Sequence, residues 1–334
     1  MTLAAPSGSG RRLPWILTVL ALATAVVTYC LVILGSTVRV TESGMGCPGW
    51  PLCYGQLGPI DRFHAVMEQS HRYVVALVTV LVVLTAIAAW RMAREHRAVV
   101  VPAIAAVGVI AIQIVLGAIT VFTHNAPVTV ALHLLFGLIV LAVTWVTAAA
   151  CLVPWRPAVG RRLSPLGYGA VACTFVLMIS GSLVVDGGAT YACPSWPFCA
   201  PHGVAGPLLA IQYAHRLTVL VTSVFIALLA MHAARRWRAV PGARLVADLV
   251  AVVLLTQVAV GGLVATLSAP AGLQDLHLAL AAAIWVMVVV LATIGWLTGA
   301  DSISVRSLRP GAKISPSTVG TGRNMGGSPS PEEG

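Results

Sequence analysis

Eight long apolar segments dominate this chain and decide its class of fold. Each is about as long as the 20 residues that a helix needs to cross a bilayer. Hydrophobic residues make up 58% of the 334 positions and charged residues 9%, which excludes a water-soluble globular protein. The sequence therefore predicts an all-α integral membrane protein with eight transmembrane helices. The segments lie near residues 15–35, 68–90, 100–122, 128–150, 166–185, 210–232, 245–267 and 274–297.

The basic residues are placed asymmetrically. A net charge of +10 could indicate a nucleic-acid partner, but all except four of the 20 Lys and Arg residues fall on one side of the predicted bundle. This is the positive-inside pattern of a membrane protein. It predicts a multi-pass protein of the bacterial cell membrane with both termini in the cytoplasm and no nucleic-acid partner. The four residues on the outer side are Arg39, Arg62, Arg72 and Arg216.

The chain contains an internal duplication. Gly35-Ser36 and the loop Cys47-Pro-Gly-Trp-Pro-Leu-Cys53 recur 146 positions later as Gly181-Ser182 and Cys193-Pro-Ser-Trp-Pro-Phe-Cys199. Farther along, the offset is 144 positions and relates His71-Arg72 to His215-Arg216, Gln113 to Gln257, Gly117 to Gly261, and His133 to His277. The sequence therefore predicts two pseudo-symmetric four-helix bundles.

Because each half has an even number of helices, both halves enter the membrane in the same sense, and both cysteine loops lie on the outer face. The predicted division of the chain is a cytoplasmic tail at 1–14, an N-terminal four-helix half at 15–150, a cytoplasmic linker at 151–165, a C-terminal four-helix half at 166–298 and a disordered cytoplasmic tail at 299–334.

Each outer loop carries two cysteines separated by five residues. Since this side of a bacterial membrane is oxidising, we expect disulfides between Cys47 and Cys53 and between Cys193 and Cys199. A redox-active disulfide that exchanges electrons with a thiol carrier is an alternative. A zinc site is a further alternative, although two sulfurs per loop are too few for a complete one.

Two histidines in each half lie inside apolar segments, where an unpartnered polar ring is costly. His71 and His133 lie at similar depth, about 6–9 Å below the outer end of their helices at the rise of an α-helix, and His215 and His277 repeat this arrangement. Paired imidazoles in a helical bundle can bind haem iron from both sides. The alternatives are histidines bonded to a backbone carbonyl or a serine, or a zinc or copper site, for which no third ligand has a fixed spacing.

Charged side chains accompany the histidines. Arg72 and Arg216, together with Arg39, are candidate partners for haem propionates because Arg binds carboxylates with a bidentate fork; snorkelling towards lipid headgroups is the alternative. Glu68 lies three residues before His71 and so on the same helical face, whereas its counterpart is Gln212. A buried carboxyl group can exchange protons near neutral pH. This difference predicts a reaction site in the first half and an electron-transfer or structural site in the second.

Together these residues resemble the haem A synthase family, in the cysteine-containing form of Gram-positive bacteria. The resemblance extends from about Trp15 to Trp296. The residues that carry it are Gly35-Ser36-Thr37-Val38-Arg39, Glu42-Ser43-Gly44, the two cysteine loops, Glu68-x-x-His71-Arg72, His133, His215 and His277.

The resemblance implies an oxidoreductase that converts the C8 methyl group of haem O to a formyl group, through a hydroxymethyl group and with oxygen from water. It implies that His215 and His277 bind haem b as a cofactor, that His71 and His133 bind the substrate haem, and that Glu68 is catalytic. Haem O synthase, cytochrome oxidase assembly factors and an electron acceptor are the implied partners, beside membrane lipid. A dihaem electron carrier and a haem-handling protein are the alternatives; both histidine pairs lie near one face, which disfavours a transmembrane carrier.

Overall fold

The computed structural model describes residues 13–57, 61–153, 164–199, 206–238, 240 and 242–298. Within these residues it contains eight helices, each long and apolar enough to cross a membrane, which confirms the predicted class of fold. Their bounds are α1 Trp15–Val40, α2 Phe63–Met92, α3 Arg97–Phe122, α4 Pro127–Leu152, α5 Pro165–Asp186, α6 Gly206–Arg236, α7 Ala243–Thr266 and α8 Ala271–Thr298. The predicted terminal tails and most of the linker lie outside the described residues.

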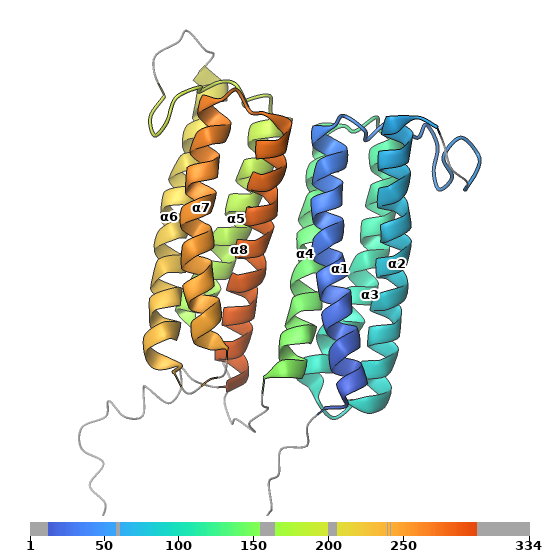
Figure 1. The fold of residues 1–334 in the computed structure, drawn as a ribbon, viewed down its shortest axis with the longest axis vertical. Helices are drawn as coiled ribbons and strands as arrows, with labels where there is room; N and C mark the ends of the chain where they lie inside the picture. Colours follow the sequence, from blue (N-terminus) through green and yellow to red (C-terminus); the bar gives the residue numbers. More distant parts are fainter. Residues whose placement is uncertain are drawn as a thin grey trace, which may run out of the picture.

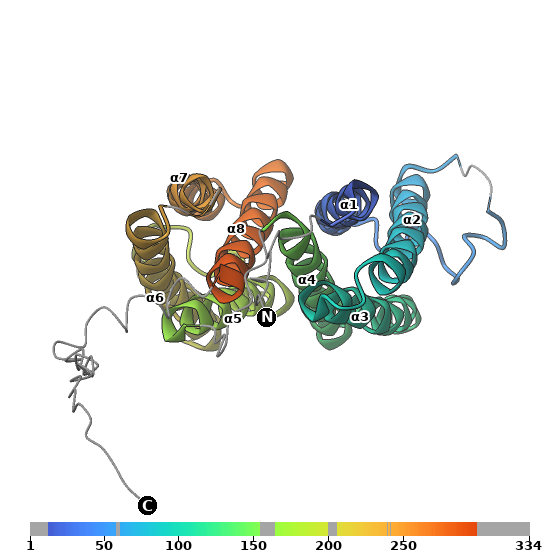
Figure 2. The same ribbon diagram turned by 90° about the horizontal axis from the view of Figure 1, so that it is seen from below.

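Each half forms a ring of four helices. In the first half α1 packs against α2 and α4, and α3 packs against α2 and α4; in the second half α5, α6, α7 and α8 repeat this order. Figure 2 shows the two rings side by side. Helices α2 and α4, and likewise α6 and α8, therefore face each other diagonally across the interior of a ring.

The even-numbered helices begin where the cysteine loops lie. Figure 1 shows the connections α1–α2 and α5–α6 at the same end of the molecule. Two helices begin at a proline, Pro127 of α4 and Pro165 of α5, where the missing N–H costs nothing and the fixed φ suits a helix. Ser164 caps α5 by accepting a hydrogen bond from the Gly167 N–H at 3.1 Å. Any residue early in α2, α4, α6 or α8 thus lies near the cysteine loops.

The halves meet along α4 and α8, with α1 and α5 beside them. Leu138 of α4 and Ala282 of α8 are fully buried in a cluster that spans this junction. Two hydrogen bonds cross it: Trp285 Nε1 donates to the Leu138 carbonyl at 3.0 Å, and Tyr29 Oη donates to the Ala279 carbonyl at 2.9 Å. Burying the indole and phenol with their polar ends satisfied makes this junction both apolar and specific in register.

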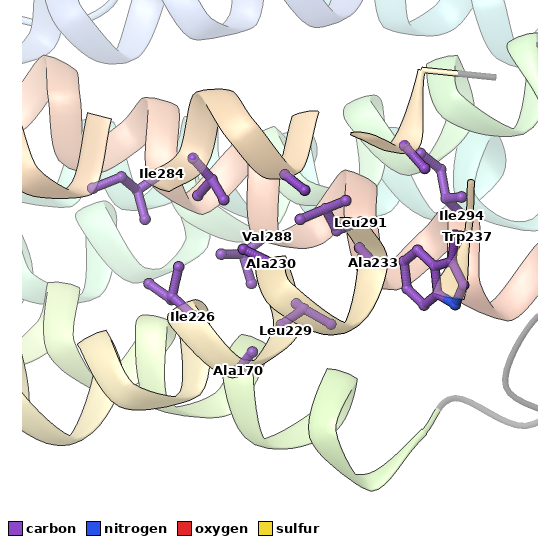
Figure 3. Packing of buried hydrophobic residues seen from close by; sticks show 13 residues of the cluster. Ala170, Ile226, Leu229, Ala230, Ala233, Trp237, Ile284, Val288, Leu291 and Ile294 are labelled. Carbon is purple, nitrogen blue, oxygen red and sulfur yellow. The ribbon is translucent and has the colours of Figure 1, made fainter. Parts of the chain in front are cut away.

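The interiors of the two halves differ at equivalent depth. In the second half, a hydrophobic cluster of aliphatic side chains and Trp237 fills the part of the helix ring away from the cysteine loops (Figure 3). In the first half, a cavity of about 10 Å³ lies among α1, α2, α3 and α4. Four threonines line it, and Thr24 and Thr85 bond to each other at 2.7 Å. The threonines are Thr24, Thr85, Thr144 and Thr147, and their counterparts in the packed half are Ala170, Leu229, Val288 and Leu291.

Candidate functional site

The structure places one histidine pair inside each ring. His71 of α2 and His133 of α4 lie within roughly the first three turns of their helices, at the end where the cysteine loops lie. His215 of α6 and His277 of α8 occupy the equivalent places in the second half. Because these helices are diagonal neighbours, each pair converges on the interior of its own ring. The sequence predicted this convergence from spacing alone.

Each imidazole packs against a glycine on a neighbouring helix. A Cβ atom at Gly35 of α1 would lie 3.3 Å from His71 Nε2, and one at Gly117 of α3 would lie 3.2 Å from His133 Cε1. The second half repeats both contacts. A Cβ atom at Gly181 would lie 3.4 Å from His215 Cε1, and one at Gly261 would lie 2.9 Å from His277 Cε1. An added methyl group would force His277 to move, would crowd His71 and His133, and would only touch His215. The four matched glycines of the duplication therefore have a structural reason.

Each ring also contains a glutamine bonded to the second histidine. Gln113 Nε2 lies 3.2 Å from His133 Nε2, and Gln257 Nε2 lies 3.3 Å from His277 Nε2. The Nδ1 atoms of both histidines are buried without a hydrogen-bond partner in the described part of the chain. A buried imidazole nitrogen without a partner is costly, and these two Nδ1 atoms are available to a ligand. The sequence showed the glutamines as matched positions, but only the structure gives them a role.

The first histidines are supported differently in the two halves. Ser180 Oγ lies 2.9 Å from His215 Nδ1, whereas the counterpart of Ser180 is Leu34. Ser180 was missed in the sequence, although a serine directly before the repeated Gly-Ser pair was a usable signal. The second half thus fixes the orientation of its imidazole by a hydrogen bond that the first half lacks.

Glu68 is buried, with 5% of its surface exposed, and both of its carboxylate oxygens have partners. Oε1 accepts a hydrogen bond from Arg72 Nη2 at 2.5 Å, and Oε2 accepts one from the Cys47 N–H at 2.7 Å. Arg72 Nη1 in turn donates to the Gly49 carbonyl at 2.7 Å. The acid beside His71 is therefore tied directly to the first cysteine loop, and Arg72 serves the loop and the acid together.

The second half lacks this ion pair. Gln212 Nε2 donates to the Ala189 carbonyl at 2.7 Å. Arg216 instead donates to the carbonyls of Pro197 at 2.8 Å and Cys193 at 3.2 Å. Both arginines thus hold a cysteine loop, but only the first half combines this with a buried carboxylate.

Arg39, the third candidate for a haem propionate, lies at the junction of the halves. Its Nη2 atom is 2.5 Å from Asp186 Oδ1 of α5. The sequence did not reveal this partner, because Asp186 has a valine, Val40, as its counterpart and belongs to no repeated motif.

Both predicted disulfides are present, Cys47–Cys53 and Cys193–Cys199. No group of three or more His, Cys, Asp or Glu side chains arranged to hold a metal ion occurs in the described ranges. The predicted disulfides close both loops, and the backbone N–H of Cys47 in the first one contacts Glu68. A redox role for this pair stays a prediction.

Comparison with known proteins agrees with this geometry. Residues 18–289 match the model of the COX15-CtaA family, described as cytochrome oxidase assembly protein. A protein of Geobacillus thermodenitrificans named haem A synthase is 32% identical over 250 residues, covering 69% of this chain and 75% of that protein. A haem A synthase of Geobacillus kaustophilus is 31% identical over 246 residues, with the same coverage of both chains. The match to the model spans six helices completely and most of the first and the last, so the chain belongs to the COX15-CtaA family of cytochrome oxidase assembly proteins.

Proposed function

We propose that this protein is a haem A synthase that oxidises the C8 methyl group of haem O to a formyl group. Family membership and relatives named haem A synthase support this activity. In balanced form, the methyl group and one water give the formyl group, four protons and four electrons, with a hydroxymethyl group formed after the first two electrons. The protein must therefore bind haem O, receive protons and pass electrons to an external acceptor.

The observation that carries the assignment of the halves is the difference between Glu68 and Gln212. We place haem O in the N-terminal half, with His71 and His133 as its ligands, and haem b in the C-terminal half, with His215 and His277 as its ligands. Oxidation of a methyl group by water releases protons. Three residues before the first histidine of the pair, the N-terminal half has the buried carboxylate Glu68, where the C-terminal half has Gln212. The C-terminal half has the neutral amide and the additional Ser180 bond, which suit a cofactor that stays in place.

The residues present fit a haem in each half. Two imidazoles from diagonal helices converge inside each four-helix ring. Glycines on the neighbouring helices leave space for these imidazoles. His133 and His277 each have a buried nitrogen without a partner. The Gln113 and Gln257 amides are placed to orient these rings, as partners behind metal-binding histidines do. Bound haem b would supply a one-electron redox centre within the same protein.

Glu68 performs the proton chemistry in this proposal. Its Oε1 and Oε2 atoms are fixed by Arg72 and by the Cys47 N–H, so the carboxylate keeps one orientation beside His71. A carboxylate held in this way can accept a proton from the attacking water and stabilise positive charge that develops at the oxidised methyl carbon. Arg72 also donates to the Gly49 carbonyl of the cysteine loop, so the same side chain fixes the loop and the carboxylate.

The orientation that we propose puts the cysteine loops outside the bacterial cell membrane and both termini in the cytoplasm, following the distribution of basic residues. Residues 15–150 and 166–298 then act as the substrate half and the haem b half. Haem O synthase and cytochrome oxidase assembly factors are the expected partners, since one supplies the substrate and the others receive the product.

The activity is tested by co-expressing the protein with a haem O synthase in a host that makes no haem A, followed by haem extraction and mass analysis. We expect the formyl product, or its hydroxymethyl precursor, only when both proteins are present. Protein that carries haem b but leaves haem O unchanged with a suitable electron acceptor would contradict the proposal and favour a dihaem electron carrier or a haem-handling protein.

A second prediction concerns Gly261→Ala. The new Cβ would lie 2.9 Å from His277 Cε1, so the imidazole must move, at a cost of about 1–3 kcal/mol for such overpacking. We expect a clear loss of haem b from the purified protein, measured by the pyridine haemochrome spectrum. Gly108→Ala on α3 is the matched control, because nothing lies within 4 Å of the added atom. Equal haem contents in the two variants would contradict the role of His277.

A further inference from the structure

Several polar side chains join the two halves at the end of the molecule where the histidines lie. Arg39 of α1 pairs with Asp186 of α5, at 2.5 Å between Nη2 and Oδ1, and Ser182 Oγ donates to Asp186 Oδ2 at 2.5 Å. Thr37 Oγ1 donates to Asp275 Oδ2 of α8 at 2.8 Å. We call this set the inter-half clamp; its residues are Thr37, Arg39, Ser182, Asp186 and Asp275.

The duplication does not account for the clamp. The counterparts of Arg39 and Asp186 are Val185 and Val40, and those of Thr37 and Asp275 are Leu183 and Ala131. Each half therefore lacks the partner that would let it form the same bonds with itself. Ser182 repeats Ser36 and bonds within α5. The other four residues have apolar counterparts and pair with each other across the junction, so their placement serves the junction and not the individual bundle.

The clamp is connected to both histidine sites over short distances along the chain. Arg39 lies one helical turn after Gly35, which contacts His71, and Ser182 directly follows Gly181, which contacts His215. Asp275 lies two residues before His277. A change in the position of Arg39 relative to Asp186 would therefore shift the segments of α1 and α5 that pack against His71 and His215.

The Arg39–Asp186 ion pair is also buried enough to contribute to the packing of the two halves. The exposed fraction of the side chain is 11% for Asp186 and 30% for Arg39, so solvent screens it less than a surface pair. By comparison, Arg244 and Asp248 within α7 are 3.4 Å apart and exposed by 63% and 59%. Pairs of the exposed kind contribute little, whereas removing one partner of a sheltered pair leaves an uncompensated charge.

We propose that the Arg39–Asp186 pair is a positioning element that fixes the spacing of the two haem sites, and that it holds no haem propionate. This inference rests on the proposed function. Arg39 and Asp186 act through α1 and α5, and neither touches the reacting group. Losing the pair should leave each half able to bind its haem, while the two halves sit less accurately relative to each other.

The test uses the single variants Asp186→Asn and Arg39→Gln and an exchange variant that carries both Arg39→Asp and Asp186→Arg. Asp248→Asn is the control. Purified protein loaded with haem O is assayed for kcat, for KM and for haem b content. The separation of the halves is measured by electron paramagnetic resonance between spin labels on genetically encoded ketone residues at the exposed positions Met45 and Tyr191.

We expect both single variants to lower kcat about tenfold or more, because small misplacements cost this much in catalysis. KM and haem b content should stay near those of the parent protein, and the distance distribution should broaden. The exchange variant should restore much of kcat and the narrow distribution, and Asp248→Asn should match the parent.

Two results would overturn the proposal. Normal kcat and distances in Asp186→Asn would show that the pair has no positioning role. Loss of activity in Arg39→Gln together with a silent Asp186→Asn and no rescue in the exchange variant would assign Arg39 to a haem propionate. If the parent protein itself forms no haem A, the proposed function fails, and the distance measurements still test the clamp independently.

Discussion

Glu68→Gln is expected to lower the formation of haem A by roughly 10²–10⁴-fold, the usual contribution of a positioned acid–base group. The substitution gives the first half the residue that the second half has at this position, Gln212. The amide can still accept the hydrogen bond from the Cys47 N–H, so the loop keeps one of its contacts. Haem b content should therefore be preserved while product is lost. The measurement is mass analysis of extracted haems beside the pyridine haemochrome spectrum.

Glu68→Asp distinguishes the catalytic role of the carboxylate from its role in the stability of the ion pair. It keeps the negative charge opposite Arg72 but shortens the side chain, so we expect partial activity and a stability close to that of the parent protein. Arg72 loses its charged partner in Glu68→Gln, and the stability cost of this loss is measured by thermal unfolding of both variants. Formation of haem A by Glu68→Gln at the parent rate would contradict the proposed mechanism. No other carboxylate of the described residues pairs with Arg72 and could take over the role of Glu68 there.

His133→Ala and His277→Ala form a matched pair with opposite expected results. His277→Ala should lower affinity for resident haem b by more than the roughly 10–100-fold that loss of a supporting partner costs a metal site, and activity should fall with it. His133→Ala should retain haem b and fail to bind or oxidise haem O. Optical spectra of the purified proteins measure resident haem, and titration with haem O measures substrate binding.

The contrast between these two variants tests the assignment of the halves. If His133→Ala lost the resident haem and His277→Ala kept it, the substrate and cofactor halves would be exchanged. If both variants lost all haem equally, the two sites would form one cooperative unit and the assignment by Glu68 would lose its support.

The sequence alone was sufficient for the eight helices, the duplication and the convergence of His71 with His133. These features follow from local apolar length and from repeated spacing, which do not depend on how distant parts pack. The pairing of Glu68 with Arg72 was not predicted, because Arg72 was assigned to a haem propionate, although the two residues are one turn apart on α2.

Contacts between the halves could not be predicted in this way. The partner of Arg39 is Asp186, which is 147 residues away, and only the packing of α1, α4, α5 and α8 brings them together. The bond between Ser180 and His215 escaped notice for a related reason, since the repeat has Leu34 at the equivalent place. Repetition reveals what two halves share, whereas these residues act where the halves differ.

The threonine-lined cavity of the first half has a consequence for turnover. Thr144 and Thr147 bond to carbonyls of their own helix, at 2.9 and 2.8 Å, so these hydroxyls stay satisfied when α4 moves away from its neighbours. Separating the aliphatic side chains of the second half would instead expose Leu229 and Leu291 and forfeit dense packing. In the proposed assignment, this first half admits haem O and releases the product in every catalytic cycle. The half that exchanges its haem is then the one that loses less aliphatic packing when its helices separate at this depth.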